Sequence, residues 1–202
     1  MIFKKMLKLH LRRLIRGFRH RLITASFLRS CHRDGINVKI GKNCVLDHCL
    51  IKGNSGCEIV IEDNCTLRYC NFSFYGKGGR IVFHDSTKVN ASSGVRTCLY
   101  VRGATVIEIG QCCLIAHSVD ISTTDFHFVF DSNGTVMNTD QNVAIGEHVW
   151  IGKRVTINKG SVIPRDSVVG ASSVVTKQFF TPNVVIAGNP ATVKKQNIYW
   201  SK

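Results

Sequence analysis

The sequence predicts an all-β protein, folded as a parallel β-helix with a short amphipathic helix at its N-terminus. The main observation is an aliphatic residue at every sixth position, without a slip, at Ile145, Ile151, Ile157, Ile163, Val169 and Val175. A small or β-branched residue stands four positions after the first five of these, at Val149, Val155, Ser161, Ser167 and Ser173. A period of six matches neither a helix nor a flat alternating strand. It is typical of a coil that places one inward aliphatic on each side of a prism.

The same register continues upstream, so the coil is expected to begin near residue 34. The spacing of six recurs at Ile109, Ile115 and Ile121, at Ile61 and Leu67, and at Ile40 and Leu46. In these repeats the small position is often a cysteine, namely Cys44, Cys65 or Cys113. Because cysteine behaves as a small hydrophobe in protein interiors, we expect these thiols to have a packing role.

The repeat is interrupted twice. Residues 71–106, which contain a glycine-rich run at 76–79, are expected to form irregular rungs or a loop. Residues 122–144 leave the register and rejoin it at Ile145. Their ionisable side chains include Asp125, His127, Asp131 and Asp140. A polar loop extruded from a rigid coil is a common place for functional residues, so this segment is the first candidate for a site.

The N-terminal segment is basic, whereas the rest of the chain is nearly balanced in charge. Residues 1–33 hold ten Lys and Arg and no acid, so residues 34–202 carry 17 − 13 = +4 of the total +14. Drawn as a helix, the segment has an apolar side that includes Leu7, Leu11 and Leu14, and a basic side that includes Arg12, Arg16 and Arg19. Such a helix is expected either to contact an anionic membrane through residues 1–30 or to pack on the body or a neighbouring subunit.

Three regions are therefore expected: a basic helical arm at 1–33, a β-helix domain at 34–193 with the extruded loop 122–144, and a tail at 194–202. An apolar content of 44% with 20% charged residues excludes general disorder. The arm lacks interleaved aromatic residues for base stacking, so nucleic acid is not an expected partner. No export signal is recognised, so a cytoplasmic location is expected, with peripheral attachment at the inner membrane face as an open alternative. In that location the nine cysteines of the protein are expected to stay reduced.

Four motifs, in this order, resemble those of the hexapeptide-repeat acyltransferases. They are Ser-Thr-Thr-Asp-Phe-His at 122–127, Ile-Gly-Glu-His-Val-Trp-Ile-Gly at 145–152, Val-Gly-Ala-Ser-Ser-Val-Val-Thr-Lys at 169–177 and Ala-Gly-Asn-Pro-Ala at 187–191. The sequence is most similar to the branch that acetylates sugars in capsule and O-antigen synthesis. The resemblance is strong over residues 100–200 and depends on the repeat alone over 35–100.

This resemblance implies a left-handed β-helix that assembles as a homotrimer, with active sites between subunits. It implies an O-acetyltransferase that moves an acetyl group from acetyl-CoA to a hydroxyl of a surface polysaccharide or of its sugar precursor. The saccharide acceptor and acetyl-CoA are thus the expected substrates, and no metal or bound prosthetic group is expected.

A base is needed for this reaction, because a sugar hydroxyl is a poor nucleophile at neutral pH. Histidine suits the task, since its ordinary pKa of about 6.5 leaves mostly neutral imidazole at pH 7. His127 lies in the second interruption and matches the family's catalytic histidine. Asp125, two residues earlier, is a candidate to hold the other ring nitrogen and set the tautomer; the alternative is a turn-forming aspartate.

The resemblance also assigns residues to the binding of acetyl-CoA or the acceptor. The matching positions are Trp150, Lys153, Ala171, Thr176, Lys177 and Lys195. The lysines can meet phosphates as point charges, and Trp150 either borders the substrate channel or packs at a subunit boundary. The chain departs from the family at Thr192, where a basic residue is usual, and at Phe179-Phe180, where a short turn is usual.

Three alternatives remain open from the sequence. The first is N-acetylation of an amino sugar or small molecule, which the same base would serve. The second is a zinc enzyme with histidines on neighbouring coils, for which His117, His127 and His148 are the candidates. The third is a trimeric membrane-associated scaffold without enzymatic activity, which would not bind coenzyme A.

Overall fold

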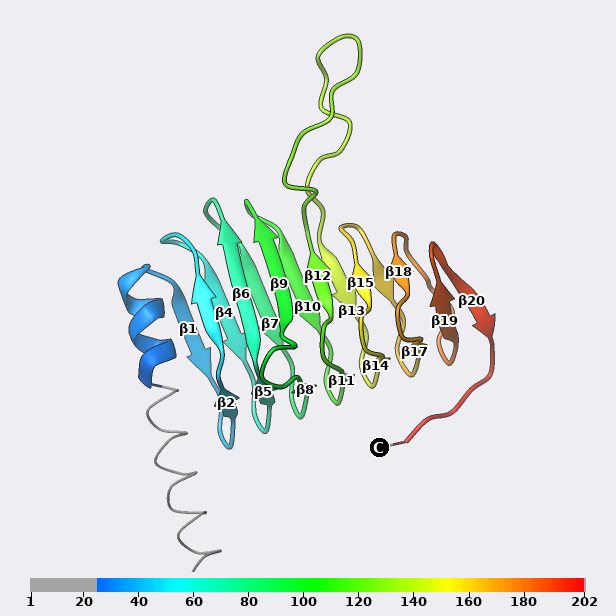
Figure 1. Ribbon diagram of the computed structural model, residues 1–202, viewed down its shortest axis with the longest axis horizontal. Coiled ribbons are helices and arrows are strands. Elements are labelled where there is room, and N and C mark those ends of the chain that lie inside the picture. The colour runs from blue at the N-terminus through cyan, green and yellow to red at the C-terminus, as the bar shows by residue number, and fades with distance from the viewer. Residues whose placement is uncertain (1–24, 202) are drawn as a thin grey trace, which may run out of the picture.

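A computed structural model describes residues 25–201, which wind into a three-sided coil (Figure 1). The first sheet contains β1 (Asn37–Ile40), β4 (Glu58–Ile61), β7 (Arg80–Phe83), β10 (Val106–Ile109), β13 (Val143–Ile145) and β16 (Val162–Ile163). The second contains β2 (Val45–Asp47), β5 (Thr66–Arg68), β8 (Lys88–Asn90), β11 (Leu114–Ile115), β14 (Trp150–Ile151), β17 (Val168–Val169), β19 (Val185–Gly188) and β20 (Ala191–Lys195). The third contains β3 (Leu50–Lys52), β6 (Cys70–Tyr75), β9 (Thr97–Arg102), β12 (Asp120–Ser122), β15 (Thr156–Ile157) and β18 (Val174–Val175). These strands pair in parallel, except that β20 turns back antiparallel to β19.

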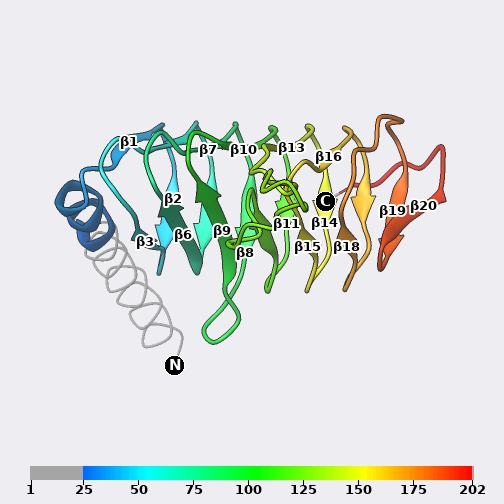
Figure 2. The same cartoon turned by 90° about the horizontal axis from the view of Figure 1, so that it is seen from above.

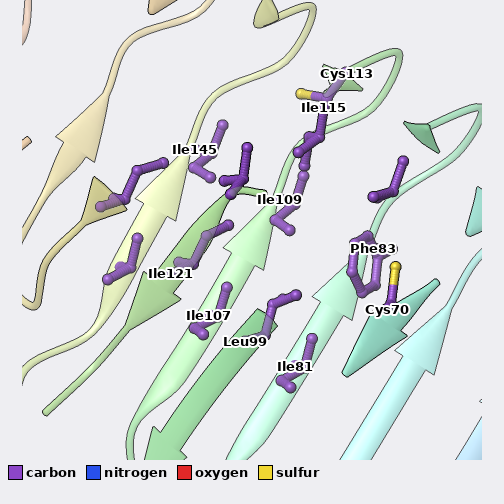
Figure 3. Packing of buried hydrophobic residues seen from close by; sticks show 14 of the residues in the cluster. Cys70, Ile81, Phe83, Leu99, Ile107, Ile109, Cys113, Ile115, Ile121 and Ile145 are labelled. Atoms are coloured by element: carbon purple, nitrogen blue, oxygen red, sulfur yellow. The ribbon is translucent and has the colours of Figure 1, made fainter. Parts of the chain in front are cut away.

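The six-residue period becomes one buried aliphatic on each side of the prism. Equivalent residues of successive coils are strand partners, as Ile121 is of Ile157 and Ile145 is of Ile163. All four side chains are almost completely buried. Figure 3 shows the resulting interior, in which side chains from the three sheets meet along the axis of the coil. The β-helix expected from the repeat is therefore confirmed.

Small residues fill the corners of the coil. Ser167 and Ser173 are buried, and each hydroxyl donates to a backbone carbonyl of its own turn, at 3.0 and 2.6 Å. Cys65 occupies the same kind of position in an earlier coil and is fully buried. Burial raises the pKa of the Cys65 thiol to about 12, which agrees with a packing role.

The two interruptions differ in the structure. Residues 71–106 were expected to be irregular, but β6, β7, β8 and β9 stack in register on their neighbours. The repeat is hard to see there because β6 and β9 are six residues long, so a coil in this region exceeds the usual length. The second interruption is a true excursion: the chain leaves after Ser122 and returns at Val143, as the long loop in Figure 1 shows.

A helix covers the N-terminal end of the coil, and the C-terminal tail folds back along its side. Residues 25–33 are helical, and Phe27 and Cys31 are buried in the core, where the Phe27 ring meets Phe72 edge-on at 6.0 Å. This part of the expected arm closes the first coil (Figure 2); the remainder, residues 1–24, lies outside the described residues. Beyond β20, the tail returns along the prism, with a hydrogen bond of 2.9 Å from the Ile198 amide to the Asn183 carbonyl. No helix within 25–201 has the length and apolar character needed to cross a membrane.

The inward aliphatics are expected to dominate stability. Ile109→Ala removes a fully buried side chain from the middle of the coil and should lower the free energy of unfolding by about 2–5 kcal/mol. Glu108→Ala, on the outward side of the same strand, should have a much smaller effect. Chemical denaturation of both variants measures the difference, and equal effects would contradict the packing described above.

Candidate functional site

The residues predicted from the sequence fall into two groups on different edges of the prism. Asp125 and His127 lie on the loop of residues 123–142, which leaves the corner between the third and first sheets; we call it the loop corner. Thr176 and Lys177 follow β18 at the same corner. The other group, Trp150, Lys153, Ala171 and Lys195, lies on the second sheet or at its junction with the third. In a three-sided coil the loop corner is opposite the second sheet, so one chain holds the two groups apart.

His127 has a fixed backbone and an open ring. Its amide donates to the Asp125 carbonyl at 2.8 Å, and its carbonyl accepts from Asn138 Nδ2 at 2.9 Å. The side chain is exposed, and its imidazole makes no hydrogen bond or ion pair with any other residue in the range 25–201. An imidazole presented in this way can accept a proton from a bound molecule.

Asn138 joins the outgoing and returning strands of the loop beside His127. Its Nδ2 also donates to the Asp125 carboxylate at 2.9 Å, and its Oδ1 accepts from the Val129 amide at 2.6 Å. Lys159, in the turn of the next coil, donates to the Asn138 carbonyl at 2.6 Å and forms an ion pair with Asp125. The Lys159 ammonium holds the pKa of the Asp125 carboxyl below its usual value. The Asp125 carboxylate thus ties the loop to the coil and makes no hydrogen bond to the His127 ring in this structure; that it orients the imidazole stays a prediction.

Arg102 holds the same segment from the preceding coil. Its Nη1 donates to the Phe126 carbonyl at 3.1 Å, and its guanidinium lies 4.3 Å from the centre of the Phe128 ring. Its Nε is 3.7 Å from the carboxylate of Asp140 on the returning strand. The residues on both sides of His127 are therefore bound by a single side chain, through a hydrogen bond and a cation–π contact.

Trp150 lies beside an aromatic stack made by the C-terminal tail. Trp200 is buried, lies flat on the His148 ring at 4.2 Å and donates from Nε1 to the His148 carbonyl at 3.0 Å. The His148 Nδ1 is 3.0 Å from the Asp166 carboxylate. The Trp150 ring is 6.1 Å from Trp200 and keeps 42% of its surface exposed, so a flat apolar face is available on the second sheet.

The remaining predicted residues line the last coils. Lys153 and Ala171 occupy successive turns, joined by a hydrogen bond of 2.9 Å from the Ser172 amide to the Lys153 carbonyl. Gly152 is needed there, because a Cβ would lie 2.7 Å from the Ala171 nitrogen. Lys177 is exposed, with its ammonium 5.5 Å from the centre of the Phe179 ring.

The last coils also show where the chain departs from the family pattern. Phe179 is buried, whereas Phe180 points outward with 76% of its surface exposed. Lys195 ends β20 and is exposed. Three exposed lysines can therefore contact an anionic ligand. Lys177 is at the loop corner, Lys195 is on the second sheet, and Lys153 is at the junction of the second and third sheets.

Asn138, Lys159 and Arg102 were not singled out from the sequence. The strand register could have identified Lys159, because Ile121 pairs with Ile157 and this pairing places Lys159 next to the start of the loop. Asn138 and Arg102 carry no such signal, since their contacts depend on the path of a loop outside the repeat. His148 and His117 lie on coil turns, where His117 meets the Ser118 hydroxyl at 3.2 Å. Within the described part of the chain, no three metal-ligating side chains converge.

Comparison with known proteins gives relatives that match most of the chain. The polysialic acid O-acetyltransferase of Neisseria meningitidis is 34% identical over 180 residues, which span 82% of this chain and 75% of that protein. The crystal structure of the polySia-specific acetyltransferase NeuO superposes with a TM-score of 0.61 at 25% identity, covering 84% of this chain and 83% of NeuO. That of the polysialic acid O-acetyltransferase OatWY gives 0.57 at 29% identity, covering 83% and 88%. No family model matches the chain.

These relatives share the coil and extend over most of both chains. The identity to the meningococcal enzyme covers residues well beyond the four motifs, and the structural matches include most of the prism. The expected left-handed winding is the one that these acetyltransferases have. The chain therefore belongs to the hexapeptide-repeat acyltransferases, in the branch that O-acetylates sugars.

Proposed function

We propose that the protein transfers an acetyl group from acetyl-CoA to a hydroxyl of a surface polysaccharide, or of its sugar precursor, with His127 as the general base. The observation that carries this proposal is the open imidazole of His127, held on a braced loop. The relatives named above act on polysialic acid, which supports a polymeric, acidic saccharide as the acceptor class.

His127 would act twice in the reaction. Its imidazole accepts the proton of the acceptor hydroxyl as that oxygen attacks the thioester carbonyl. As the C–S bond breaks, the imidazolium gives this proton to the departing thiolate of coenzyme A, which leaves as the thiol, so the base is regenerated. No covalent acyl-enzyme is needed, because donor and acceptor are held together at one site.

A homotrimer supplies the geometry that one chain lacks. His127 and Trp150 are on opposite parts of the prism, so a complete site needs the loop corner of one subunit against the second sheet of the next. Three parallel prisms around a threefold axis provide this contact at each of three equivalent interfaces. Trp150, Lys153, Ala171 and Lys195 would then bind the donor with Thr176 and Lys177 from the neighbouring loop corner.

The test of this function measures thiol release from acetyl-CoA with polysialic acid, neutral polysaccharides, free sugars and amino sugars as acceptors. Release that depends on a hydroxyl-bearing saccharide and is lost in His127→Ala is the expected result. Transfer to amino sugars alone would indicate N-acetylation. No release, together with no thermal stabilisation by acetyl-CoA, would indicate a scaffold.

The loop braces should matter for rate rather than stability. Asn138→Ala removes hydrogen bonds to Asp125, His127 and Val129 and should lower kcat by about 10- to 100-fold, because the base is displaced. The melting temperature should change little, since the coil is untouched. Asn133→Ala in the same loop is the matched control, because only its backbone is hydrogen-bonded; a similar loss in that variant would contradict a specific role for Asn138.

Mixed trimers test the shared site. His127→Ala and Trp150→Ala chains, each nearly inactive alone, are co-expressed with different tags and purified on both. If His127 and Trp150 of different subunits form each site, every trimer that carries both tags has one intact interface of three, so about a third of the wild-type activity returns. Pairing of both residues within one chain would give no recovery, and this result would reject the arrangement.

We further propose that the N-terminal arm attaches the enzyme to anionic membranes. Residues 1–24 hold eight of the ten basic residues of the arm, and each is worth about 1 kcal/mol near an anionic surface. Deletion of 1–24 leaves Phe27 and Cys31 in the core, so the coil should keep its stability and its activity on soluble acceptors. Sedimentation with phosphatidylserine vesicles should fall by at least tenfold, and unchanged sedimentation would refute membrane attachment.

A further inference from the structure

A pocket of about 460 Å³ lies at the base of the loop that carries His127. It is lined by Tyr75, Gly76, Arg102, Gly103, Phe126 and Asp140. Tyr75 and Arg102 are strand partners at the ends of β6 and β9, and Phe126 immediately precedes His127 in the chain. Its volume is within the range of about 300–1,000 Å³ that is usual for small-molecule sites.

Two half-exposed aromatic rings form the apolar wall. Tyr75 and Phe126 each keep 41% of their surface exposed, and their rings meet edge-on at 5.4 Å. The Phe126 ring is also held by Tyr100, edge-on at 5.5 Å. A rigid corner of two rings offers apolar surface to the C–H groups of a sugar ring without first having to be ordered.

The polar wall is an incompletely paired guanidinium and carboxylate. Arg102 Nε and the Asp140 carboxylate are 3.7 Å apart, which is longer than a hydrogen bond. Arg102 donates one hydrogen bond, from Nη1 to Phe126, and a guanidinium has five N–H groups. Donors therefore remain for a ligand carboxylate, while Asp140 can accept from ligand hydroxyls.

A second pocket of similar volume, about 450 Å³, provides a contrast. It lies on the first sheet and is lined mostly by apolar and glycine residues, including Pro164, Phe179 and Phe180. Its charged lining residues, His84 and Glu108, are paired with each other at 3.0 Å. It lacks the available guanidinium and is not next to His127.

We propose that the Tyr75–Arg102 pocket binds one acidic sugar residue of the acceptor, with the ring on Tyr75 and Phe126 and the carboxylate on Arg102. This inference depends on the proposed function, because it names a subsite for the acceptor of that reaction. A sugar residue bound there contacts Phe126, which directly precedes His127 in the chain. A hydroxyl of a neighbouring sugar in the same acceptor chain can then reach the imidazole of His127.

Tyr75→Ala tests the apolar wall, with Phe180→Ala in the other pocket as the matched control. We expect the acceptor KM to rise by about five- to tenfold in Tyr75→Ala, while the KM for acetyl-CoA and the slow hydrolysis without acceptor stay unchanged. Tyr75→Phe should restore most of the affinity. An unchanged acceptor KM in Tyr75→Ala would overturn the proposal, as would a rise in Phe180→Ala alone.

Arg102→Gln tests the carboxylate. Because Arg102 also braces the loop, the readout is the ratio of KM values for polysialic acid and for the same polymer with its carboxyl groups reduced to alcohols. Wild type should prefer the acidic polymer by about tenfold or more, and the variant should bind both alike. A preference that persists in Arg102→Gln would refute the assignment.

Binding measured without turnover distinguishes failure of the proposed acetyl transfer from failure of the proposed sugar subsite. Calorimetric titration of oligosialic acid into His127→Ala protein should give binding that becomes about five- to tenfold weaker when Tyr75→Ala is added in the double variant. If wild type releases no thiol with any acceptor, the proposed function has failed. If wild type is active and the titration does not respond to Tyr75, only the subsite has failed.

Discussion

Parallel hydrogen bonding between successive coils is the constraint on which the structure depends. Trp150 and Ile151, for example, are in register with Leu114 and Ile115 before them and with Val168 and Val169 after them. Neighbouring strands lie about 4.8 Å apart, so a coil cannot tilt or slide without breaking bonds on both sides. Extra residues can therefore leave only at a corner. The loop does so after Ser122, and β12 still pairs with β9 and β15.

The same constraint explains how a long exposed loop can hold His127, the proposed base, in a defined position. Arg102 belongs to the coil before the loop, and Lys159 belongs to the coil after it. Both positions are set by the stack, and their contacts converge on residues 125–128 and Asn138. The part of the loop that carries His127 thus takes its position from the prism, while the ring itself stays open. A functional residue on a loop does not require the loop to be mobile, provided that the part of the loop nearest the prism is bound to two fixed coils.

The sequence predicts the coil well because the coil is periodic. Ile121 and Ile157 are recognisable from spacing alone, and their pairing follows from it. The regions that were not predicted lack a period of six: β6 and β9 are longer strands, so 71–106 looked irregular although it stacks in register. The braces of His127 were not predictable for a related reason. Arg102 and Asn138 contact the segment around His127, and these contacts depend on the path of a non-repeating loop, which no local pattern encodes.

The division of residues between corner and sheet links catalysis to assembly. A single prism has one continuous core from Phe27 to Ala191, yet it carries His127 and Trp150 on opposite parts. The loop also exposes large apolar side chains beyond His127, with 55% of Val129, 57% of Phe130 and 68% of Met137 accessible in one chain. Such a patch is unfavourable in water and favours a partner surface. In the proposed trimer, the contact that covers these side chains is the same one that brings the base to the donor, so burial of the loop and completion of the site are one event.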